Sequence, residues 1–410
     1  MKTGLEYQEP IRQVFRQNLP LALRLKETIA KYTSAIVERE KSGPIKIMNF
    51  CGTHEWTTTR YGLRDLLPQS LDLVAGPGCP VCITPSYYVD VALKLAAEGI
   101  RVYTYGDVLR LRSVKSGYPA SLEEARAEGG DVKVVYSFLD AVKDASRDDG
   151  QSIFFAIGFE TTVPSYALTI REGMVPKNLK LLNAVRLTPP AMRYTIQLYR
   201  ERGLLPVQGV IAPGHVSTII GAAEWNFLPQ EYGLPTVVAG FEPIDVLMAV
   251  AQILLMIKSN KPANQIEYKR LVSWEGNKYA KAAIDEVFEK VDSAWRGMGF
   301  IPSSGFKLRG EFFEKYDALK NFGLPDLAPK ESFPADDHRV KWEDDMPPQC
   351  RCADIVVGIA KPTECPMFMN GCTTMKPWGP CMVSSEGTCN VWARHGSKDI
   401  MRPSESEVGG

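Results

Sequence analysis

The chain lacks the features that would place it at once in a common class. Its 48 Lys and Arg residues balance 48 Asp and Glu residues, so the basic surplus that favours binding to DNA or RNA is missing. Neither G-x-x-x-x-G-K-[ST] nor G-x-G-x-x-G occurs in the 410 residues, which removes support for a P-loop ATPase and for a dinucleotide-dependent dehydrogenase. Nucleic acid is therefore not an expected partner.

Long apolar runs are also scarce. The longest, IDVLMAVAQILLMI at 244–257, is shorter than the roughly 20 residues that a bilayer core requires, and it contains Asp245 and Gln252. The N-terminal MKTGLEYQEPIRQVFRQNLP mixes acids, bases and amides, unlike a signal peptide. We expect a cytoplasmic protein with no membrane partner. Its nine cysteines should be mostly reduced and serve as metal ligands or redox groups rather than as a structural disulfide framework.

The rhythm of the chain predicts an α/β fold. Short β-rich runs alternate with helical stretches from residue 45 onward, as expected of strands buried on both faces of a parallel sheet. The first set comprises IKIMNF (45–50), LDLVAG (71–76), IRVYTYG (100–106) and VKVVYS (132–137). The second set comprises IFFAIG (153–158), LKLLNAV (179–185), VQGVIAPG (207–214) and TVVAGF (236–241). Corresponding runs lie about 105 to 110 residues apart, which indicates either two domains related by internal duplication or a chance likeness between two ordinary α/β units.

Changes in composition set the predicted domain boundaries. The chain is helical before residue 45, becomes helical again after about 258, and is rich in proline and acid at 324–349. We predict an N-terminal helical segment (1–44) packed with the C-terminal domain, two similar α/β domains (45–149 and 150–260), a helical and cysteine-rich domain (261–396) and a disordered tail (397–410).

Unusual motifs follow the predicted strands. They are CGTHE (51–55), GPGCPVC (76–82), YGD (105–107), GFETT (158–162), APGHVST (212–218) and GFEP (240–243). Ligands of open α/β sheets bind beyond the carboxyl ends of the strands, where loops meet helix N-termini. We therefore predict that the two sheets face a common cleft and that these motifs line it.

Cysteine chemistry at these strand ends leaves several alternatives. The pair Cys79 and Cys82 just ahead of a predicted helix can exist as thiolates, form a disulfide or bind metal. Together with Cys51 and His54 it makes a Cys3His set, so structural zinc is an alternative. A thiol hydrolase is disfavoured, because nucleophile and base normally come from separate parts of a fold.

Two further polar residues have more than one interpretation. Glu160 in GFETT and His215 in APGHVST are compatible with helix capping or packing as well as with a functional role.

Six of the nine cysteines fall within residues 350–389. Packing does not explain such a density, and four thiolates are the usual complement of a [4Fe-4S] cluster. Zinc sites favour C-x-x-C pairs, which this segment lacks. A metal site is expected here, although spacing alone does not choose four ligands from six.

The ordered motifs CGTHE, GPGCPVC, GFETT, PGHV, GFEP and CMVSSEGTC resemble those of the HypD family of [NiFe]-hydrogenase maturation factors, over residues 10–395. The resemblance implies a [4Fe-4S] cluster on the pattern C-x14-C-x6-C-x16-C. The four ligands would be Cys350, Cys365, Cys372 and Cys389. Cys352 and Cys381 would remain as a further pair.

The resemblance also implies a function. HypD-like proteins act with a HypC-type chaperone to hold iron while cyanide from a HypE-type partner and carbon monoxide are attached, and the Fe(CN)2CO unit then passes to the hydrogenase large subunit. Cys51 would bind the iron, His54 and Glu55 would orient its thiolate, and Cys79 with Cys82 would exchange electrons with the cluster. The remaining contacts to the iron complex would come from Glu160, Thr161, Thr162, His215 and Glu242.

Such a protein is an assembly scaffold with redox function more than a turnover enzyme, and its terminal segment should fold back on the α/β domains. Two rival hypotheses remain. One is a stand-alone thiol-disulfide oxidoreductase that uses Cys79, Cys82 and the cluster without a partner. The other is an interaction protein held together by zinc.

Overall fold

The chain folds into two compact units, each made of segments that are far apart in the sequence. The computed structural model describes residues 16, 18–41, 43–114, 119–329, 340–341 and 345–396, so the predicted disordered tail lies outside the described residues. Unit 1 comprises Met1–Gly78, Met192–Asn277 and Val391–Gly410, and unit 2 comprises Cys79–Ala191 and Lys278–Asn390.

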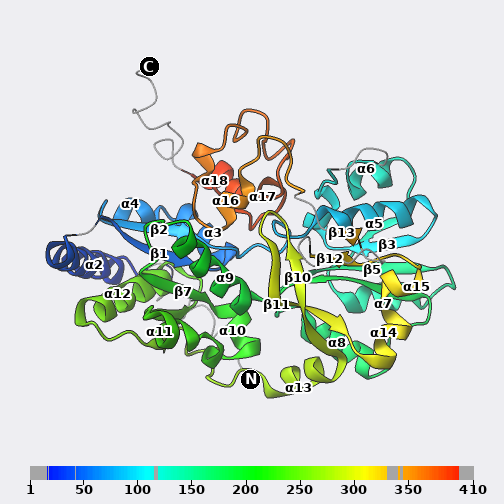
Figure 1. Ribbon diagram of the computed structural model, residues 1–410, viewed down its shortest axis with the longest axis horizontal. Helices are drawn as coiled ribbons and strands as arrows, with labels where there is room; N and C mark the ends of the chain where they lie inside the picture. The colour runs from blue at the N-terminus through cyan, green and yellow to red at the C-terminus, as the bar shows by residue number, and fades with distance from the viewer. Residues whose placement is uncertain are drawn as a thin grey trace. The chain divides into compact units, whose positions relative to one another are not determined.

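Unit 1 contains a five-stranded parallel sheet in the order β2-β1-β7-β8-β9 (Figure 1). Its strands are β1 (Ile45–Asn49), β2 (Leu71–Ala75), β7 (Gly209–Pro213), β8 (Thr236–Ala239) and β9 (Asn264–Ile266). Every residue of β7 and β8 is buried, as expected of central strands that are covered on both faces. The prediction of an α/β protein with parallel sheets is confirmed here and in unit 2.

Two long helices build the core of unit 1 on one face of this sheet. α2 (Leu19–Glu40) lies beside α12 (Pro243–Ser259), and α12 packs on β7 and β8 (Figure 1). The side chain of Asn18 accepts a hydrogen bond from the main-chain N–H of Leu21, which caps the first turn of α2. The apolar run at 244–257 is thus explained by burial, because α12 is enclosed between the sheet and α2.

Unit 2 contains a four-stranded parallel sheet in the order β4-β3-β5-β6. Its strands are β3 (Arg101–Thr104), β4 (Val132–Val134), β5 (Ser152–Gly158) and β6 (Leu179–Val185). α5 (Ser86–Ala97) precedes the first of these strands, and α6 (Leu122–Ala127), α7 (Phe138–Ala145) and α8 (Val163–Arg171) connect them. α5 packs with α6 and α7 packs with α8. Right-handed crossovers explain these two layers, because the steps from β3 to β4 and from β5 to β6 run in opposite directions across the sheet.

A second group of elements completes unit 2. α13 (Lys278–Val287) packs on α8, and the antiparallel hairpin of β10 (Phe288–Trp295) and β11 (Gly299–Leu308) packs on β6. Short elements follow: α14 (Gly310–Tyr316), α15 (Ala318–Asn321), β12 (Leu327–Ala328), β13 (Val340–Lys341), α16 (Cys352–Val356), η3 (Pro362–Glu364) and α17 (Pro380–Val383).

The cysteine-rich segment is fastened to the α/β part of unit 2 through η1 (Gly106–Arg110). Asp107 accepts hydrogen bonds from the hydroxyl groups of Ser384 (3.1 Å) and Ser385 (3.0 Å). Arg110 donates to the main-chain carbonyl of Met375 (2.7 Å). The terminal segment therefore folds back on the α/β elements of its own unit, as the sequence predicted.

The two sheets have matching strand orders, but each combines strands from both halves of the predicted repeat. The predicted repeat pairs β1 with β5, β2 with β6, β3 with β7 and β4 with β8. With this pairing the order β2-β1-β7-β8 matches the order β6-β5-β3-β4. Each sheet thus takes two strands from the first half and two from the second.

The predicted division into consecutive domains at 45–149 and 150–260 was wrong for this reason. β7 pairs with β1, and β5 pairs with β3, so neither predicted domain contains a complete sheet. The N-terminal helix packs on α12 of unit 1, and residues up to Asn277 belong to unit 1 rather than to a domain that begins at 261. Periodicity along a chain reveals strands, but pairing depends on contacts between distant segments.

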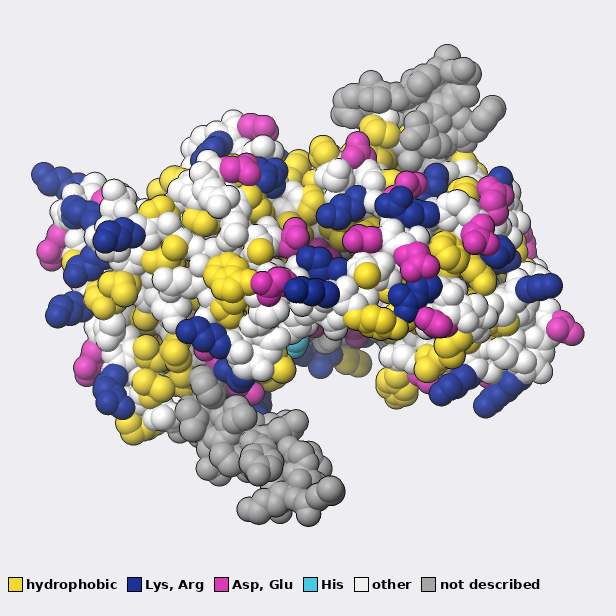
Figure 2. All heavy atoms as spheres, turned by 90° about the horizontal axis from the view of Figure 1, so that it is seen from below, with side chains coloured by type: hydrophobic (Ala, Val, Ile, Leu, Met, Phe, Trp, Pro, Cys, Tyr) yellow, Lys and Arg dark blue, Asp and Glu magenta, His cyan; other side chains and the backbone are white. Residues whose placement is uncertain are grey.

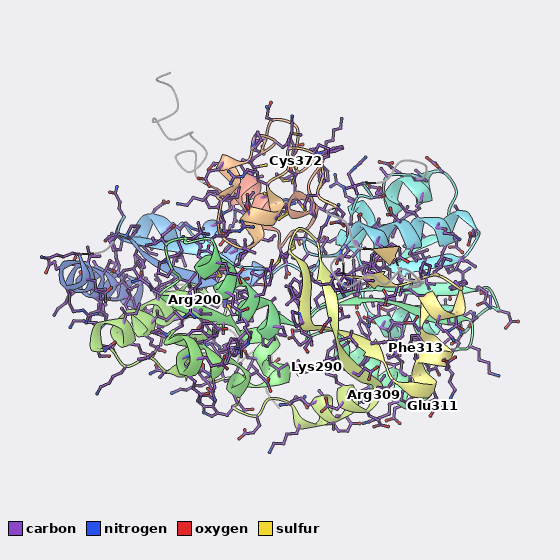
Figure 3. All side chains as sticks on the ribbon, viewed as in Figure 1. Arg200, Lys290, Arg309, Glu311, Phe313 and Cys372 are labelled. Carbon is purple, nitrogen blue, oxygen red and sulfur yellow. A yellow bond between two sulfur atoms is a disulfide. The ribbon has the colours of Figure 1, made fainter. Side chains whose placement is uncertain are left out.

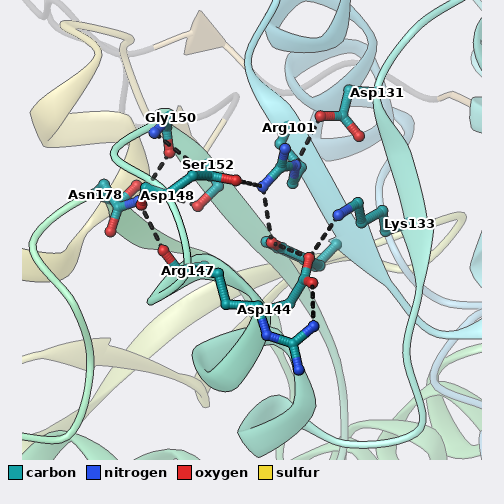
Figure 4. A network of polar contacts seen from close by, with 11 residues as sticks. Arg101, Asp131, Lys133, Asp144, Arg147, Asp148, Gly150, Ser152 and Asn178 are labelled. Atoms are coloured by element: carbon teal, nitrogen blue, oxygen red, sulfur yellow. Dashed lines mark hydrogen bonds and ion pairs between the residues drawn. The ribbon is translucent and has the colours of Figure 1, made fainter.

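A network of ion pairs holds the amino-terminal ends of the unit 2 strands (Figure 4). Arg101, at the start of β3, donates to Asp131 (2.7 Å) and Asp148 (2.8 Å). The side-chain amide of Asn178, just before β6, donates to three main-chain carbonyls that precede β5. Exposed ion pairs contribute only about 0 to 1 kcal/mol each, so this network closes the end of the sheet opposite to the motifs rather than forming a site.

The surface is mixed in charge. On the face shown in Figure 2, Lys and Arg side chains are interspersed with Asp and Glu side chains. This distribution agrees with a formal net charge of zero. Within the described parts of the chain, we find no helix whose length and apolarity would let it span a bilayer.

Replacing Leu254 by alanine should lower the stability of unit 1, because this α12 side chain is fully buried in the core. Substitutions of this kind cost about 2 to 5 kcal/mol. Leu255→Ala is the matched control, since the neighbouring side chain is 47% exposed. Calorimetry should show a lower unfolding midpoint for Leu254→Ala alone, and equal effects of both variants would contradict the buried face assigned to α12.

Candidate functional site

The CGTHE motif lies where the unit 1 sheet changes direction. β1 leads to β2 on one side and β7 leads to β8 on the other, so their connections diverge from adjacent carboxyl ends. Such a switch point leaves a crevice in which ligands of open α/β sheets bind. Cys51 follows β1 as the N-cap residue of α3 (Gly52–Arg60), and His215 follows β7 in α10 (Gly214–Ile220). The predicted placement of both motifs at strand ends is confirmed.

The backbone of Cys51 is held by the two glycines of the GPGCPVC motif. Gly52 N–H donates to the carbonyl of Gly78 (3.2 Å), and a Cβ on Gly78 would lie 2.5 Å from the Cα of Cys51. Gly76 N–H donates to the carbonyl of Asn49 (2.6 Å), and a Cβ there would meet this carbonyl at 3.0 Å. Only glycine permits these approaches. Cys51 itself is half-buried and is not part of a disulfide.

The buried side chain of Glu55 fixes the CGTHE motif through hydrogen bonds. Its carboxylate is 1% exposed and accepts hydrogen bonds from Arg64 (2.8 and 2.9 Å), Asn49 (3.0 Å) and the indole of Trp392 (2.7 Å). Burial by itself raises the pKa of this carboxyl, but the charge of Arg64 and the hydrogen bonds together lower it below its ordinary value. Protein donors occupy both oxygens, which agrees with an orienting role for Glu55 rather than with contact to a ligand.

His54 is fully buried and fixed on both sides of its ring. Its Nε2 lies 2.8 Å from the carbonyl of Gly240, and the ring stacks on Phe241, which also stacks on His215. A carbonyl only accepts, so Nε2 carries the hydrogen and Nδ1 keeps a lone pair. Within the described residues Nδ1 has no hydrogen-bond partner. Burial lowers the pKa of His54 to about 4, so the ring is neutral near neutral pH.

A cavity of about 460 Å³ lies at this carboxyl edge of the unit 1 sheet. Its lining includes Thr53 and Trp56 after β1, His215 after β7, Glu242 after β8, and Tyr268 and Arg270 after β9. A volume of this order suits a small ligand or a chain terminus. The predicted residues His215 and Glu242 therefore reach a common cavity, in which Glu242 also forms the N-cap of α12.

The matching switch point of unit 2 lies between β3 and β5, where GFETT follows β5. Glu160 is buried and accepts hydrogen bonds from the N–H (2.7 Å) and the hydroxyl (3.1 Å) of Thr188. Desolvation raises its pKa to about 7. Because Thr188 begins α9 (Thr188–Glu201), Glu160 has the capping role that the sequence left open. Thr161 is exposed, and the Thr162 hydroxyl donates to a main-chain carbonyl three residues earlier (3.0 Å).

The Cys79 and Cys82 pair forms a buried disulfide in unit 2, with the Cα atoms 5.4 Å apart. Cys82 N–H also donates to the sulfur of Cys79 (3.2 Å). Among the alternatives left by the sequence, the structure thus has the disulfide. A disulfide offers zinc no thiolate, so the Cys3His set is not formed in this state. A second disulfide joins Cys352 to Cys381, the two residues left over from the cluster pattern.

The other four terminal cysteines share one region of unit 2. Cys350, Cys365, Cys372 and Cys389 are not in disulfides, and Cys372 lies between η3 and α17 (Figure 3). The Cys350 thiol donates a hydrogen bond to Cys365, and a charge on Cys365 acts on both Cys372 and Cys389. The residues chosen by the family pattern are therefore brought together by the fold.

The surroundings of these thiols fit an iron-sulfur cluster. The main-chain N–H groups of Trp378 (3.2 Å) and Gly379 (3.3 Å) donate to the Cys372 sulfur, and Cys365 accepts three further main-chain N–H groups. Hydrogen bonds of this kind tune cluster potentials. A Cβ on Gly379 would lie 2.4 Å from the Cys350 sulfur, so only glycine fits beside this thiol.

A single metal ion is less well served by the described residues. Among them, no group of three or more His, Cys, Asp or Glu side chains is arranged to hold such an ion. A cubane cluster places each cysteine on a different iron atom, so its ligands need not converge on one point.

Sequence reasoning missed the residues that fix these motifs from outside. Trp392 is 337 positions from Glu55, and no local pattern relates the two. Glu267 accepts a hydrogen bond from the N–H of Gly240 (3.0 Å), and Arg270 pairs with Asp245. No local signal marked Glu267 and Arg270, because the short strand β9 before them reads Asn-Gln-Ile and has no apolar pattern.

Replacing Glu55 by glutamine should destabilise unit 1 by about 3 to 5 kcal/mol, because Arg64 would keep a largely buried charge without its partner. The lowered pKa gives a sign to the pH dependence: stabilisation by Glu55 is full above its ordinary pKa of 4.5 and is lost as the pH falls below it. Acid unfolding should therefore be shallower in Glu55→Gln than in the wild type.

The matched control for this change is Asp65→Asn, in the neighbouring α4 (Leu63–Leu66), where the side chain is exposed. It should leave the acid unfolding curve unchanged. A curve for Glu55→Gln that overlays the wild type would contradict the anchoring role.

Comparison with known proteins agrees with the arrangement of these motifs. The family model of HypD, described as the hydrogenase formation hypA family, matches residues 27–396. A putative hydrogenase expression/formation protein of Methanocaldococcus jannaschii is 40% identical over 359 residues, which cover 87% of this chain and 93% of the relative.

Relatives from bacteria are similarly close. Hydrogenase maturation factor HypD2 of Bradyrhizobium diazoefficiens is 39% identical over 86% of this chain and 90% of its own length. Hydrogenase maturation factor HypD of Cupriavidus necator is 39% identical over 361 residues, with the same shares of the two chains. The chain therefore belongs to the HypD family.

Proposed function

We propose that this protein is a hydrogenase maturation factor on which the Fe(CN)2CO group of [NiFe] hydrogenase is assembled. It would hold iron together with a HypC-type chaperone, receive cyanide through a HypE-type partner, and serve the hydrogenase large subunit indirectly. The names of its relatives support the general role. The observation that carries the finer proposal is the loop of Cys51, which places a reduced thiol at a sheet switch point.

Cys51 supplies the chemistry that iron with strong-field ligands requires. A thiolate is a soft ligand suited to such iron, and a thiol of the chaperone would complete a site from which the metal can be transferred. The N-terminus of α3 favours negative charge on its N-cap residue. Glu55 and His54 are both held by other protein groups, so they orient the loop without competing for the metal.

Cys79 and Cys82 would supply electrons. Their disulfide takes up two electrons and two protons to give the dithiol, and it forms again when the dithiol gives them up. Bound to Cys350, Cys365, Cys372 and Cys389, a [4Fe-4S] cluster would supply electrons singly. The N–H groups directed at Cys372 and Cys365 would set its potential.

This proposal requires Cys51 of unit 1 and the dithiol of unit 2 to serve one cleft. Support comes from the chain itself. Gly78, whose backbone packs against Cys51, is followed directly in the sequence by Cys79. The glycine that positions the thiol is therefore also the residue that leads into the redox pair.

Replacing Cys389 by serine should abolish the visible absorption of the anaerobically purified protein and reduce its iron and sulfide content, because one of four cluster ligands is lost. Cys51→Ala should leave both unchanged. A colourless wild-type protein that contains stoichiometric zinc would contradict the cluster.

Replacing Cys51 by alanine should remove the infrared bands of bound cyanide and carbon monoxide from the complex purified with a HypC-type chaperone, because the thiolate ligand of the iron is missing. Maturation of hydrogenase should fail in the same cells. Met174→Ala, a change at a position that is 52% exposed and has no assigned role, serves as the control and should retain the bands.

Two results would count against this assignment. Persistence of the bands in Cys51→Ala would place the iron elsewhere. Turnover of a disulfide substrate by the protein alone, without any partner, would favour the stand-alone oxidoreductase.

A further inference from the structure

We propose that Glu267 holds a proton that it shares with Asp245, and that this pair acts through the peptide groups of Gly240 to fix His54 as the Nε2–H tautomer. Glu267 and Asp245 are then positioning residues for the Cys51 loop, although neither belongs to a motif recognised in the sequence. This inference rests on the proposed function only for its consequence at the iron. The protonation and the tautomer can be measured without iron.

A continuous chain of contacts links the two carboxyl groups to the histidine. Glu267 Oε2 accepts a hydrogen bond from the N–H of Gly240 (3.0 Å), and the carbonyl of the same residue accepts from His54 Nε2 (2.8 Å). The exposed fractions are 0% for His54, 0% for Asp245 and 8% for Glu267. Water therefore has little access to any link of this chain.

Only glycine fits at position 240. A Cβ there would lie 2.2 Å from Asp245 Oδ2 and 2.6 Å from the ring of Tyr268. The carboxyl groups consequently lie directly against the main chain that carries the hydrogen bond to His54. Because Gly240 has no side chain, movement of these carboxyl groups acts directly on the backbone that contacts His54.

An acceptor without a donor marks the place of the proton. Asp245 Oδ2 accepts from the N–H of Glu242 (3.0 Å) and from Arg270, but Asp245 Oδ1 is fully buried and has no hydrogen-bond partner within the described residues. A buried acceptor left without a donor is costly. The side chain of Glu267 is within hydrogen-bonding reach of the Asp245 carboxyl group, so a proton on Glu267 would give this pair of buried acceptors a donor.

The local charges favour the same arrangement. Glu267 faces Asp245 of α12, the N–H of Gly240 after β8, and Arg270 and Tyr268 after β9. Two carboxyl groups thus share one cation, so one proton leaves the cluster neutral. Burial, followed by the charge of Asp245, raises the pKa of Glu267 to about 7.

The consequence for His54 is a fixed acceptor. With Nε2–H donating to Gly240, the lone pair of Nδ1 remains available three residues after Cys51. If Glu267 were replaced by a group that cannot accept from the Gly240 N–H, the backbone on both sides of the Gly240 Cα could turn. The carbonyl that accepts from His54 would then shift, and the tautomer would no longer be fixed. Loss of an outer partner of this kind typically weakens metal binding about 10 to 100-fold.

Glu267→Gln and Glu267→Leu separate protonation from packing. The glutamine can accept from the Gly240 N–H and donate to the Asp245 carboxylate, so it imitates the protonated acid. The leucine can do neither. Histidine-selective ¹⁵N NMR is practical because the chain has four histidines.

We expect the protonated-carboxyl absorption of the wild type near neutral pH to exceed that of Glu267→Gln, in which other buried acids such as Glu160 still contribute. His54 should be the Nε2–H tautomer in the wild type and in Glu267→Gln, but not fixed in Glu267→Leu. Iron loading with the chaperone should match the wild type in Glu267→Gln and fall about tenfold or more in Glu267→Leu.

The pH dependence has a defined sign. The pKa of folded Glu267 is raised above its ordinary 4.5, so its favourable contribution is full below that pH and is lost as the pH rises through about 7. The unfolding midpoint of the wild type should fall over this interval, and that part of the fall should be absent in Glu267→Gln.

Several outcomes would overturn the proposal. One is a wild type without any protonated-carboxyl absorption, another is equal absorption in the wild type and in Glu267→Gln, and a third is a His54 that carries its hydrogen on Nδ1. If the band and the tautomer are as expected but Glu267→Leu loads iron normally, the positioning role fails while the proposed function stands, since the latter depends on Cys51.

Discussion

The buried carboxylate of Glu55 is the interaction on which the geometry of the Cys51 loop depends. A charge taken out of water is tolerated only when it is paired and hydrogen-bonded, and here a guanidinium, an amide and an indole meet that demand. These donors come from β1, from α4 and from α18 (Thr388–His395). Glu55 therefore connects the CGTHE motif to three separate elements, one of which is distant in the sequence.

Burial also decides what the motif can do chemically. His54 is neutral because its ring is enclosed, and Glu55 is ionised because its donors outweigh enclosure. Cys51 is the one member of the three whose side chain is only partly enclosed. A buried, hydrogen-bonded surround with one partly accessible soft donor is suitable for holding a metal that must later leave.

The repeated plan of the two sheets gives these motifs equivalent positions. CGTHE follows β1 and GFETT follows β5, which correspond in the repeat, and both lie at switch points. Equivalent positions have nevertheless taken different roles. In unit 1 the loop carries a thiol and an imidazole, whereas in unit 2 Glu160 caps α9.

Much of this could be predicted from the sequence, because strand periodicity and the position of a motif after a strand are local properties. The apolar runs, the two sets of strands and the motifs at their carboxyl ends were found in this way. The exchange of strands between sheets was not, since β7 and β5 are equally apolar and nothing in either encodes its neighbour. Trp392 and Glu267 were missed because their partners are distant in sequence.

The central claim is that Cys51 and the Cys79/Cys82 pair act on one iron. Its most direct test is mild oxidation of the Cys82→Ser variant, followed by mass spectrometry of its peptides. With Cys82 removed, Cys79 should form a disulfide with Cys51 if both thiols serve one site. Such a bond forms only when the two Cα atoms come within about 7 Å, so the cross-link tests their proximity. A peptide linked through Cys51 and Cys79 is the predicted result, and two thiols that remain separate would contradict the account.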